Sequence, residues 1–332
     1  MLKNHTYQPL PFSVFVVTEP KIREIFAADF QDRVVHHLLY NYLSPIFEPK
    51  FIFDSYACRK GKGTHRAVKR LFQFIKKITG NYRQKAFYLQ TDIKNFFPSI
   101  NHDILFNLIK RHTNNADILW LAKIIIYYDC ARNPVKKSQL SLFSQIPAQK
   151  SLFNAPPGQG LPIGNLTSQF FANVYLNELD QFVKHRLKCR YYIRYVDDFV
   201  ILDKSRENLY RIKQEAERFL QEKLALKLHP EKWLIEDVFK GINTLGYLIK
   251  PDYILARKRV VKNLKKKLFQ FQQGKVNLSY ALSCVNAYYA HFSHADSYKL
   301  RKHLWEKHFG ILKKFLEPVD DFRHFKLKNN TA

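Results

Sequence analysis

Two short apolar runs on either side of an acidic turn form the most regular pattern in the chain. Residues 191–194 and 199–202 are rich in β-branched and aromatic side chains, and the sequence Tyr-Val-Asp-Asp lies between them. This pattern predicts a β-hairpin. Two adjacent carboxylates at a hairpin tip repel each other and resist desolvation. Asp197 and Asp198 are therefore either an exposed acidic turn or part of a functional site.

Apolar residues at a spacing of three to four predict helices over much of the remaining chain. The first is expected to begin near Lys21 and to be ended by Pro45 and Pro49. Ser205 is expected to cap a later helix that ends near residue 225. The other expected helices cover 64–78, 103–111, 117–130 and 166–187, and Lys/Arg-rich helices follow from residue 257. Strands are expected at 12–17, 87–92 and 245–249, a turn at 229–232 and a surface loop at 133–158.

A third carboxylate lies well upstream, in a similar setting. Asp92 ends the expected strand 87–92, and active-site carboxylates often lie at strand ends. Phe97 follows five residues later, where an aromatic ring could form one wall of a nucleotide pocket. The alternative is that Phe96 and Phe97 are simply core residues.

Three further segments combine cations or glycines with a helix start. The loop 55–66 has five basic side chains, four Lys or Arg, including Arg59 and Lys62, and one His, and its glycines would let the backbone approach a phosphate. Its spacing differs from that of a P-loop, and a basic loop is usually a solvated turn. The stretch Gly-Leu-Pro-Ile-Gly-Asn-Leu-Thr-Ser-Gln, residues 160–169, also places glycines before a helix. Cations crowd the first helix after residue 257, and with the interleaved Tyr288, Tyr289 and Phe292 they suit a nucleic-acid backbone or form only a solvated face. The cations concerned are Arg257, Lys258, Lys262, Lys265 and Lys266.

The charge of the chain favours a polyanionic partner. Its 332 residues carry 55 Lys and Arg against 28 Asp and Glu, a net charge of +27, which suggests nucleic acid or an anionic membrane. The sequence has no apolar run of about 18 residues and no signal peptide, which weakens the membrane interpretation. Its four cysteines lie far apart, so we expect neither a zinc knuckle nor a disulfide framework, and we expect a reducing, cytoplasmic compartment. Convergent carboxylates in a basic protein are what a pair of Mg²⁺ ions needs for nucleotidyl transfer.

In this order, these elements resemble the fingers, palm and thumb of a reverse transcriptase. The resemblance covers about residues 20–310 and rests on the Asp-x-x-x-Phe-Phe sequence at Asp92, the 160–169 stretch and Tyr-Val-Asp-Asp. It implies an α+β right-hand polymerase with a palm built on an antiparallel sheet and with a helical thumb. The implied parts are an N-terminal arm and fingers at 1–86, a palm at 87–250 that includes the loop 133–158 and the helix 166–187, and a thumb and C-terminal tail at 251–332.

The resemblance also implies roles for the matching positions. Asp92, Asp197 and Asp198, with Ile93 beside them, would hold two Mg²⁺ ions, with Mn²⁺ as an alternative, and would catalyse RNA-directed DNA synthesis from a DNA or RNA primer. Phe97 would be the steric gate that selects dNTPs over ribonucleotides. The other implied dNTP contacts are Arg59, Lys62, Phe96, Ile163, Gly164 and Lys232, and the implied primer grip is Leu245, Gly246 and Tyr247.

One departure from the common reverse transcriptase pattern is informative. Ile163 stands where many of these enzymes have Gln, and Ser168-Gln169 replaces Ser-Pro. This pattern is similar to that of diversity-generating retroelement reverse transcriptases, which copy a template-repeat RNA with frequent errors opposite adenine and work with a basic accessory variability protein. Gln can hydrogen-bond near the incoming sugar and the templating base, whereas Ile offers only apolar contact. The alternatives are a bacterial defence or group II intron-like reverse transcriptase, and a non-catalytic nucleic-acid-binding protein, against which the three intact acids argue.

Overall fold

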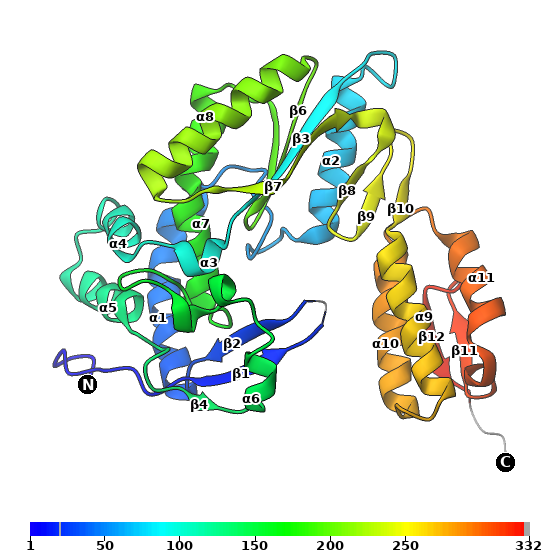
Figure 1. Ribbon diagram of the computed structural model, residues 1–332, viewed down its shortest axis with the longest axis horizontal. Helices are drawn as coiled ribbons and strands as arrows, with labels where there is room; N and C mark the ends of the chain where they lie inside the picture. The colour runs from blue at the N-terminus through cyan, green and yellow to red at the C-terminus, as the bar shows by residue number, and fades with distance from the viewer. Residues whose placement is uncertain (20, 329–332) are drawn as a thin grey trace. The chain divides into compact units, whose positions relative to one another are not determined.

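The computed structural model describes residues 1–19 and 21–328, which form two compact units (Figure 1). One unit contains Met1–Gly63 and Leu89–Ile235, and the other contains Thr64–Tyr88 and the chain from Glu236 onward. The segment Thr64–Tyr88 is thus grouped with the C-terminal part of the chain, whereas the sequence placed it with the N-terminal arm and fingers. The division into fingers, palm and thumb stays a prediction.

A four-stranded sheet with the strand order β5-β6-β3-β7 organises the first unit. Its strands are β3 (Phe87–Ile93), β5 (Tyr191–Tyr195), β6 (Asp198–Asp203) and β7 (Leu228–Asp237). β5 and β6 pair antiparallel with Tyr195 opposite Asp198, which confirms the hairpin around the acidic turn. The expected turn at 229–232 was wrong, because these residues belong to β7. Pro230 is compatible with this strand since β7 lies at the edge of the sheet, where a missing N–H breaks no ladder.

Helices pack against this sheet and against one another. α7 (Leu166–Gln181) is buried on nearly all sides, continues as a π-helical turn at Phe182–Arg186, and contacts α8 (Arg206–Leu224), which also packs on β6 (Figure 1). Ser205 caps α8 through its side chain, as expected. The remaining helices of this part are α1 (Phe30–Phe47), η1 (Glu48–Lys50), α3 (Phe96–Ser99), α4 (His102–Lys110) and α5 (Ala116–Tyr127).

The N-terminal region differs from the expected long helix. Arg23–Ala27 forms strand β2, which pairs antiparallel with β1 (Ser13–Val17), and α1 begins only at Phe30. The apolar residues of 22–26 also suit a strand, and the fully buried Phe26 lies opposite Val14. Pro45 lies inside α1 without ending it there. The expected surface loop 133–158 contains β4 (Val135–Lys136), α6 (Leu140–Phe143), η2 (Ala148–Lys150) and η3 (Leu152–Asn154).

The second unit combines the expected helices with small sheets. α2 (Thr64–Ile78) has the bounds that the sequence predicted and contacts β9. The other elements are η5 (Val238–Lys240), β8 (Ile242–Thr244), β9 (Tyr247–Ile249), β10 (Ile254–Ala256), α9 (Lys258–Gln272), α10 (Leu278–Phe292), α11 (Tyr298–His308), η6 (Gly310–Lys314), β11 (Leu316–Val319) and β12 (His324–Leu327). The β11–β12 hairpin was not expected. It packs with α9, α10 and α11 around a core that includes the fully buried Tyr289 and Phe292. The expectation that these two rings face nucleic acid was therefore wrong, and Tyr288 packs against the same core.

Candidate active site

The acidic turn lies at one end of the four-stranded sheet, beside the end of β3. Val196 and Asp197 form the turn between β5 and β6, and the N–H of Ile93 donates to the carbonyl oxygen of Asp197 at 3.3 Å. Asp92 is the penultimate residue of β3, which neighbours β6 in the sheet. The carboxyl group of Asp197 lies close enough to that of Asp92 for the negative charge of Asp92 to act on it. Two carboxyl groups about a hundred positions apart along the chain are therefore brought together by strand order.

The proximity of these acids strongly perturbs their protonation. Burial, the charge of Asp92 and the charge of Asp198 raise the pKa of Asp197 to about 7. Burial and the charge of Asp92 raise the pKa of Asp198 to about 6, against the opposing effect of Lys21, Lys232 and Arg23. Asp198, the first residue of β6, is more exposed than Asp197, so solvent screens its charge more. The cluster thus holds more negative charge than its surroundings stabilise, which is the situation that a bound cation relieves.

Lys232 provides one positive charge at this site. It lies on β7, and its Nζ is 3.0 Å from Oδ2 of Asp92. The lysine side chain is 49% exposed and that of the aspartate 19%, so this ion pair reaches solvent. Lys232 therefore lies next to the carboxyl cluster, and its implied contact with a dNTP stays a prediction.

The residues present fit a divalent cation that shares its coordination with a substrate. Within residues 1–19 and 21–328, no group of three or more His, Cys, Asp or Glu side chains is arranged to hold a metal ion by itself. Mg²⁺ is usually bound by one or two protein carboxylates, with water and substrate phosphates completing an octahedron. Asp92 and Asp197 supply such a pair, and the raised pKa of Asp197 shows that nearby cations do not fully offset the negative charge of the cluster.

The residues expected to contact a dNTP differ in how deeply they are buried. Phe96 is 2% exposed and belongs to the core, so its expected contact with a nucleotide is not supported. Phe97 is half-buried beside it, with ring centroids 5.3 Å apart, and is the ring that can line a pocket. The carbonyl of Ile163 accepts from the N–H of Phe26 at 2.8 Å. Gly164 has φ +130°, and a Cβ there would lie 2.8 Å from the carbonyl oxygen of Phe26, so this close approach to β2 requires glycine.

The basic loop is held mainly by internal contacts. The Arg59 side chain is 7% exposed and donates to Glu48 and to the carbonyl oxygens of Ile52 and Ser55. Its expected role in binding triphosphate is therefore not supported by its position, which instead suits shaping the loop. The Nζ of Lys62 donates to the Phe53 carbonyl oxygen at 2.7 Å and lies 3.5 Å from the centroid of the Phe53 ring. Farther along the chain, Ser168 is buried in α7, whereas Gln169 is exposed.

The expected primer grip forms the turn between β8 and β9. Leu245 and Gly246 are the turn residues, with φ of +50° and +87°. Tyr247 is fully buried, and its hydroxyl lies 3.1 Å from a ring nitrogen of both His65 and His291. Its side chain is thus a core group, which corrects the expectation that it contacts a primer.

The basic residues of α9 lie on one side of the helix. Leu264 and Leu268 are buried on the other side. The cations Lys258, Lys262 and Lys266 are exposed, whereas Arg257 and Lys265 are half-buried. Part of this basic side borders a groove of about 500 Å³ whose lining includes Lys258, Lys262, Lys265, Leu255 and Leu300.

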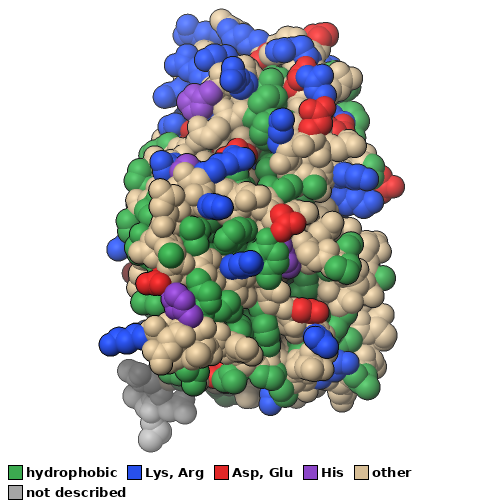
Figure 2. All heavy atoms as spheres, turned by 90° about the vertical axis from the view of Figure 1, so that its left-hand side faces the viewer, with side chains coloured by type: hydrophobic (Ala, Val, Ile, Leu, Met, Phe, Trp, Pro, Cys, Tyr) green, Lys and Arg blue, Asp and Glu red, His purple; other side chains and the backbone are tan. Residues whose placement is uncertain are grey.

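Positive charge is not confined to this helix. Lys and Arg side chains also gather on the upper part of the face in Figure 2, the side on which α8 lies in Figure 1. Within α8, Lys213 pairs with Glu217 and Arg218 pairs with Glu215. The charge distribution therefore supports a polyanionic partner without locating it on one surface. None of the helices in the described part of the chain is long and apolar enough to cross a lipid bilayer.

Comparison with known proteins decides the class to which this site belongs. Residues 18–249, well over half of the chain, match the family model described as reverse transcriptase (RNA-dependent DNA polymerase). The chain belongs to the reverse transcriptase family. Members of this family use divalent metal ions, in agreement with the carboxyl pair formed by Asp92 and Asp197.

Similar proteins come from bacteria and plants. Protein YkfC of Escherichia coli K12 is 24% identical, over 80% of this chain and 73% of that protein. The group II intron-encoded protein LtrA of Lactococcus lactis is 24% identical, over 94% of this chain and 56% of its own. Nuclear intron maturase 1, mitochondrial, of Arabidopsis thaliana is 21% identical, over 75% and 44%. This reverse transcriptase thus spans only about half the length of two of these three relatives.

Solved telomerase structures show the same fold. Apo telomerase from Candida tropicalis aligns with a TM-score of 0.56 at 11% identity, over 86% of this chain and 52% of that chain. Telomerase from Candida albicans in complex with a fragment of telomeric RNA aligns with a TM-score of 0.53 at 13% identity, over 92% and 58%. At such identity the similarity concerns the fold alone. It confirms the α+β right-hand polymerase fold expected from the sequence.

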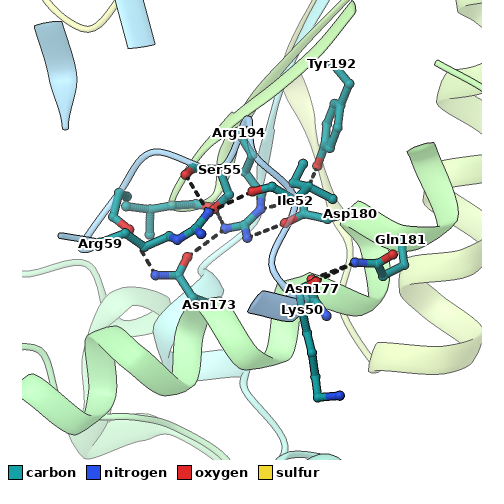
Figure 3. Close-up of polar contacts among 12 residues, drawn as sticks. Lys50, Ile52, Ser55, Arg59, Asn173, Asn177, Asp180, Gln181, Tyr192 and Arg194 are labelled. Atoms are coloured by element: carbon teal, nitrogen blue, oxygen red, sulfur yellow. Dashed lines mark hydrogen bonds and ion pairs between the residues drawn. The ribbon is translucent and has the colours of Figure 1, made fainter. Parts of the chain in front are cut away.

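One group in this reverse transcriptase was not indicated by the sequence patterns used above. Arg194 in β5 and Asp180 in α7 form a buried ion pair (Figure 3), and Arg194 also donates to the carbonyl oxygen of Val196 in the acidic turn. The sequence signals only Arg194, which is the one charged residue of the strand Tyr-Tyr-Ile-Arg-Tyr, whereas Asp180 lies in a helix that also contains Glu178 and several polar residues. A buried charge without a partner is strongly unfavourable, so Arg194 predicts a partner, although the spacing does not identify it.

Proposed function

We propose that this chain catalyses RNA-templated DNA synthesis by metal-dependent nucleotidyl transfer, with Asp92 and Asp197 as the carboxylates that hold the cations. The observation that carries this proposal is that strand order places Asp92 beside Asp197 at the end of the sheet, where Ile93 bonds the backbone of Asp197. Membership of the reverse transcriptase family supports the reaction class. RNA as template, a DNA or RNA primer and dNTPs are the corresponding substrates.

The side chains around the carboxyl pair have distinct proposed roles. Bound Mg²⁺, or Mn²⁺ in its place, would lower the pKa of the primer 3′-hydroxyl and offset the charge of the leaving pyrophosphate. Asp92 and Asp197 hold that charge in place, with the backbone of Ile93 beside them, and Asp198 adds a third negative charge nearby. Lys232, 3.0 Å from Asp92, can bring a proton to the leaving group.

The positions around the carboxylates are suited to substrate selection and nucleic-acid binding. Phe97 presents a half-buried ring where a ribose 2′-hydroxyl would meet steric exclusion, and Gly164 allows the close approach to β2 that holds the neighbouring Ile163 in place. Lys62 is the cation of the 55–66 loop proposed to contact the triphosphate. The exposed basic side of α9 suits a nucleic-acid backbone, whose phosphates it would neutralise. The turn at Leu245 and Gly246 is the proposed primer grip.

Within the family, we assign the chain to the diversity-generating retroelement type. The supporting residues are Ile163 and Ser168-Gln169, which replace the common Gln and Ser-Pro. The hydrogen bond from Phe26 fixes the backbone at Ile163, so its half-buried side chain offers an apolar contact where Gln would offer polar atoms. Mispairs opposite adenine would then meet a smaller penalty, and a basic accessory variability protein is the expected partner.

The rival assignment is a group II intron-like reverse transcriptase, which the similarity to LtrA and to the Arabidopsis intron maturase favours. The error spectrum of DNA synthesis separates the two. If the retroelement assignment holds, the wild type misincorporates mainly at template adenine and Ile163→Gln lowers that frequency. An error spectrum that is the same for both proteins contradicts the proposed role of Ile163.

Primer extension tests the activity itself. Wild type and Asp197→Ala are compared on poly(rA)/oligo(dT) with Mg²⁺, with Asp252→Asn, an exposed acid in the other unit, as a charge-matched control. Activity in the wild type and the control but not in Asp197→Ala supports the proposal. Equal signals from all three indicate a contaminating polymerase, and no signal from any of them favours the non-catalytic nucleic-acid-binding protein.

A further inference from the structure

A fully buried ion pair lies behind the turn that carries Asp197. The side chains of Arg194 and Asp180 are 1% and 0% exposed, and they are joined by two hydrogen bonds of 2.6 Å and 2.8 Å (Figure 3). The hydroxyl of Tyr192 donates to the same carboxylate at 2.6 Å. This bidentate arrangement fixes the plane of the guanidinium group, because two parallel bonds allow it little rotation.

The third nitrogen of this guanidinium, Nη1, donates to the acidic turn. Nη1 of Arg194 donates to the carbonyl oxygen of Val196 at 2.9 Å and to Oδ1 of Asn173 at 3.3 Å. That carbonyl belongs to the peptide bond whose nitrogen is that of Asp197. Val196 has φ +56°, a left-handed conformation that is unusual for a β-branched residue. Such a backbone persists only where its surroundings hold it, and the bond from Arg194 does this on the carbonyl side.

The same residue also joins a second segment of the site. Its backbone N–H donates to the carbonyl oxygen of Asp54, and its carbonyl accepts from the N–H of Tyr56, both at 3.0 Å. Asn173 donates to the carbonyl oxygen of Ala57 at 3.0 Å. The segment before the basic loop is therefore attached to β5 by backbone bonds, which do not depend on the Arg194 side chain. Removal of that side chain should release the turn and leave this attachment in place.

We propose that Arg194, oriented by Asp180, is a positioning residue that holds the Val196–Asp197 peptide so that Asp197 can share a cation with Asp92. This inference rests on the proposed function. The alternative is that the pair contributes only to folding. In that case its loss would affect catalysis no more than any equally destabilising change elsewhere in the unit.

Two variants separate positioning from folding. The double variant Arg194→Met/Asp180→Leu removes both charges together, and apolar replacement of a buried pair is often neutral or stabilising. It leaves the Val196 carbonyl without its donor. Arg194→Lys keeps the charge opposite Asp180, but one ammonium group cannot reproduce the bidentate bond and also reach the turn. The control is Tyr7→Phe, which removes a buried hydrogen bond of 2.7 Å to Asp32 in the same unit.

Three readouts are compared for each protein: the unfolding midpoint, Mn²⁺ binding by electron paramagnetic resonance without substrate, and kcat and KM in primer extension. For the double variant and for Arg194→Lys we expect weaker Mn²⁺ binding and a kcat lower by about tenfold to a hundredfold. The KM for dNTP should change little. Tyr7→Phe should lower the midpoint and leave Mn²⁺ binding and kcat near those of the wild type.

The proposal is overturned if Arg194→Lys, or a folded double variant, binds Mn²⁺ and turns over like the wild type. It is equally overturned if Tyr7→Phe loses as much Mn²⁺ binding and kcat as they do. A double variant that does not fold shows that the pair is needed for folding, and the decision then rests on Arg194→Lys. If the wild type itself shows no polymerase activity, the proposed function fails, whereas the Mn²⁺ measurement still tests the positioning of Asp197.

Discussion

Replacement of Asp197 by Asn is expected to stabilise the metal-free protein while it abolishes DNA synthesis. The carboxyl of Asp197 is held beside those of Asp92 and Asp198, and its pKa is raised to about 7 by burial and by their charges. Asparagine resembles the protonated form, since its amide can donate to Asp92 as the protonated acid does. It carries no charge to be repelled, and it is a much poorer ligand for a divalent cation.

The size and direction of the effect follow from proton linkage. Between the ordinary pKa of 3.8 and the folded value of about 7, the folded state binds more protons than the unfolded state. The free energy of unfolding therefore falls as pH rises through this range. The difference between the two values corresponds to about 4 kcal/mol, and partial solvent access lowers the expectation to about 2–4 kcal/mol. Asp197→Asn does not lose unfolding free energy in this way. Its unfolding free energy should therefore exceed that of the wild type by the full amount above pH 7, and the two should be equal near pH 4.

Thermal unfolding in the presence of EDTA measures this difference. At pH 8 the unfolding midpoint of Asp197→Asn should exceed that of the wild type by roughly 4–16 °C, and the gap should shrink toward pH 4. Mg²⁺ at pH 8 should raise the midpoint of the wild type more than that of the variant, because a ligand stabilises only the state that binds it. Asp252→Asn controls for net charge. A metal-free variant that is no more stable than the wild type at pH 8 would refute the reasoning.

Three further substitutions test other parts of the site. Lys232→Ala should lower kcat by about a hundredfold. It should change the free energy of unfolding by less than about 1 kcal/mol, since its ion pair reaches solvent. An unchanged kcat would exclude a proton-donating role. Gly164→Ala should lower the free energy of unfolding by about 2–3 kcal/mol, because the new Cβ meets the backbone of β2. The matched control Gly158→Ala, whose Cβ meets open space, should lower it by about 1 kcal/mol. Equal losses for the two variants would contradict this. Phe97→Val should raise kcat/KM for ribonucleotides relative to dNTPs by about tenfold to a hundredfold. An unchanged ratio would contradict the steric-gate role. The control Phe96→Val should mainly lower the unfolding midpoint.

The elements that position the carboxylates could be predicted because their patterns are local. The apolar runs around the acidic turn specify a hairpin, and the strand that ends near Asp92 is bounded by its own alternation. The order of strands in the sheet is not a local property. The convergence of Asp92 with Asp197 is therefore what the reverse transcriptase resemblance implies, and the structure brings the two residues together at one end of the sheet.

Other features depend on contacts distant in the sequence, and there the patterns misled or were silent. The residues at 22–26 have apolar spacing that suits a helix, yet pairing with β1 makes them a strand. Pro230 suggested a turn, but an edge position in the sheet accommodates it. Tyr289 and Phe292 lie among cationic helices in the sequence, yet they form the core beneath them. The partner of Arg194 could not be identified because nothing in the sequence aligns α7 with β5.

The most direct test of the account is to place a cleaving ion at the proposed cation site. Bound Fe²⁺ reduces added hydrogen peroxide to hydroxyl radicals, which cut the backbone close to the ion, and ascorbate returns the iron to Fe²⁺. If Asp92 and Asp197 share a cation, the protein should be cut near both residues 92 and 197, Mg²⁺ should suppress both cuts, and Asp197→Asn should lose both. Cleavage near only one of these positions, or cuts that Mg²⁺ does not suppress, would contradict a shared cation site.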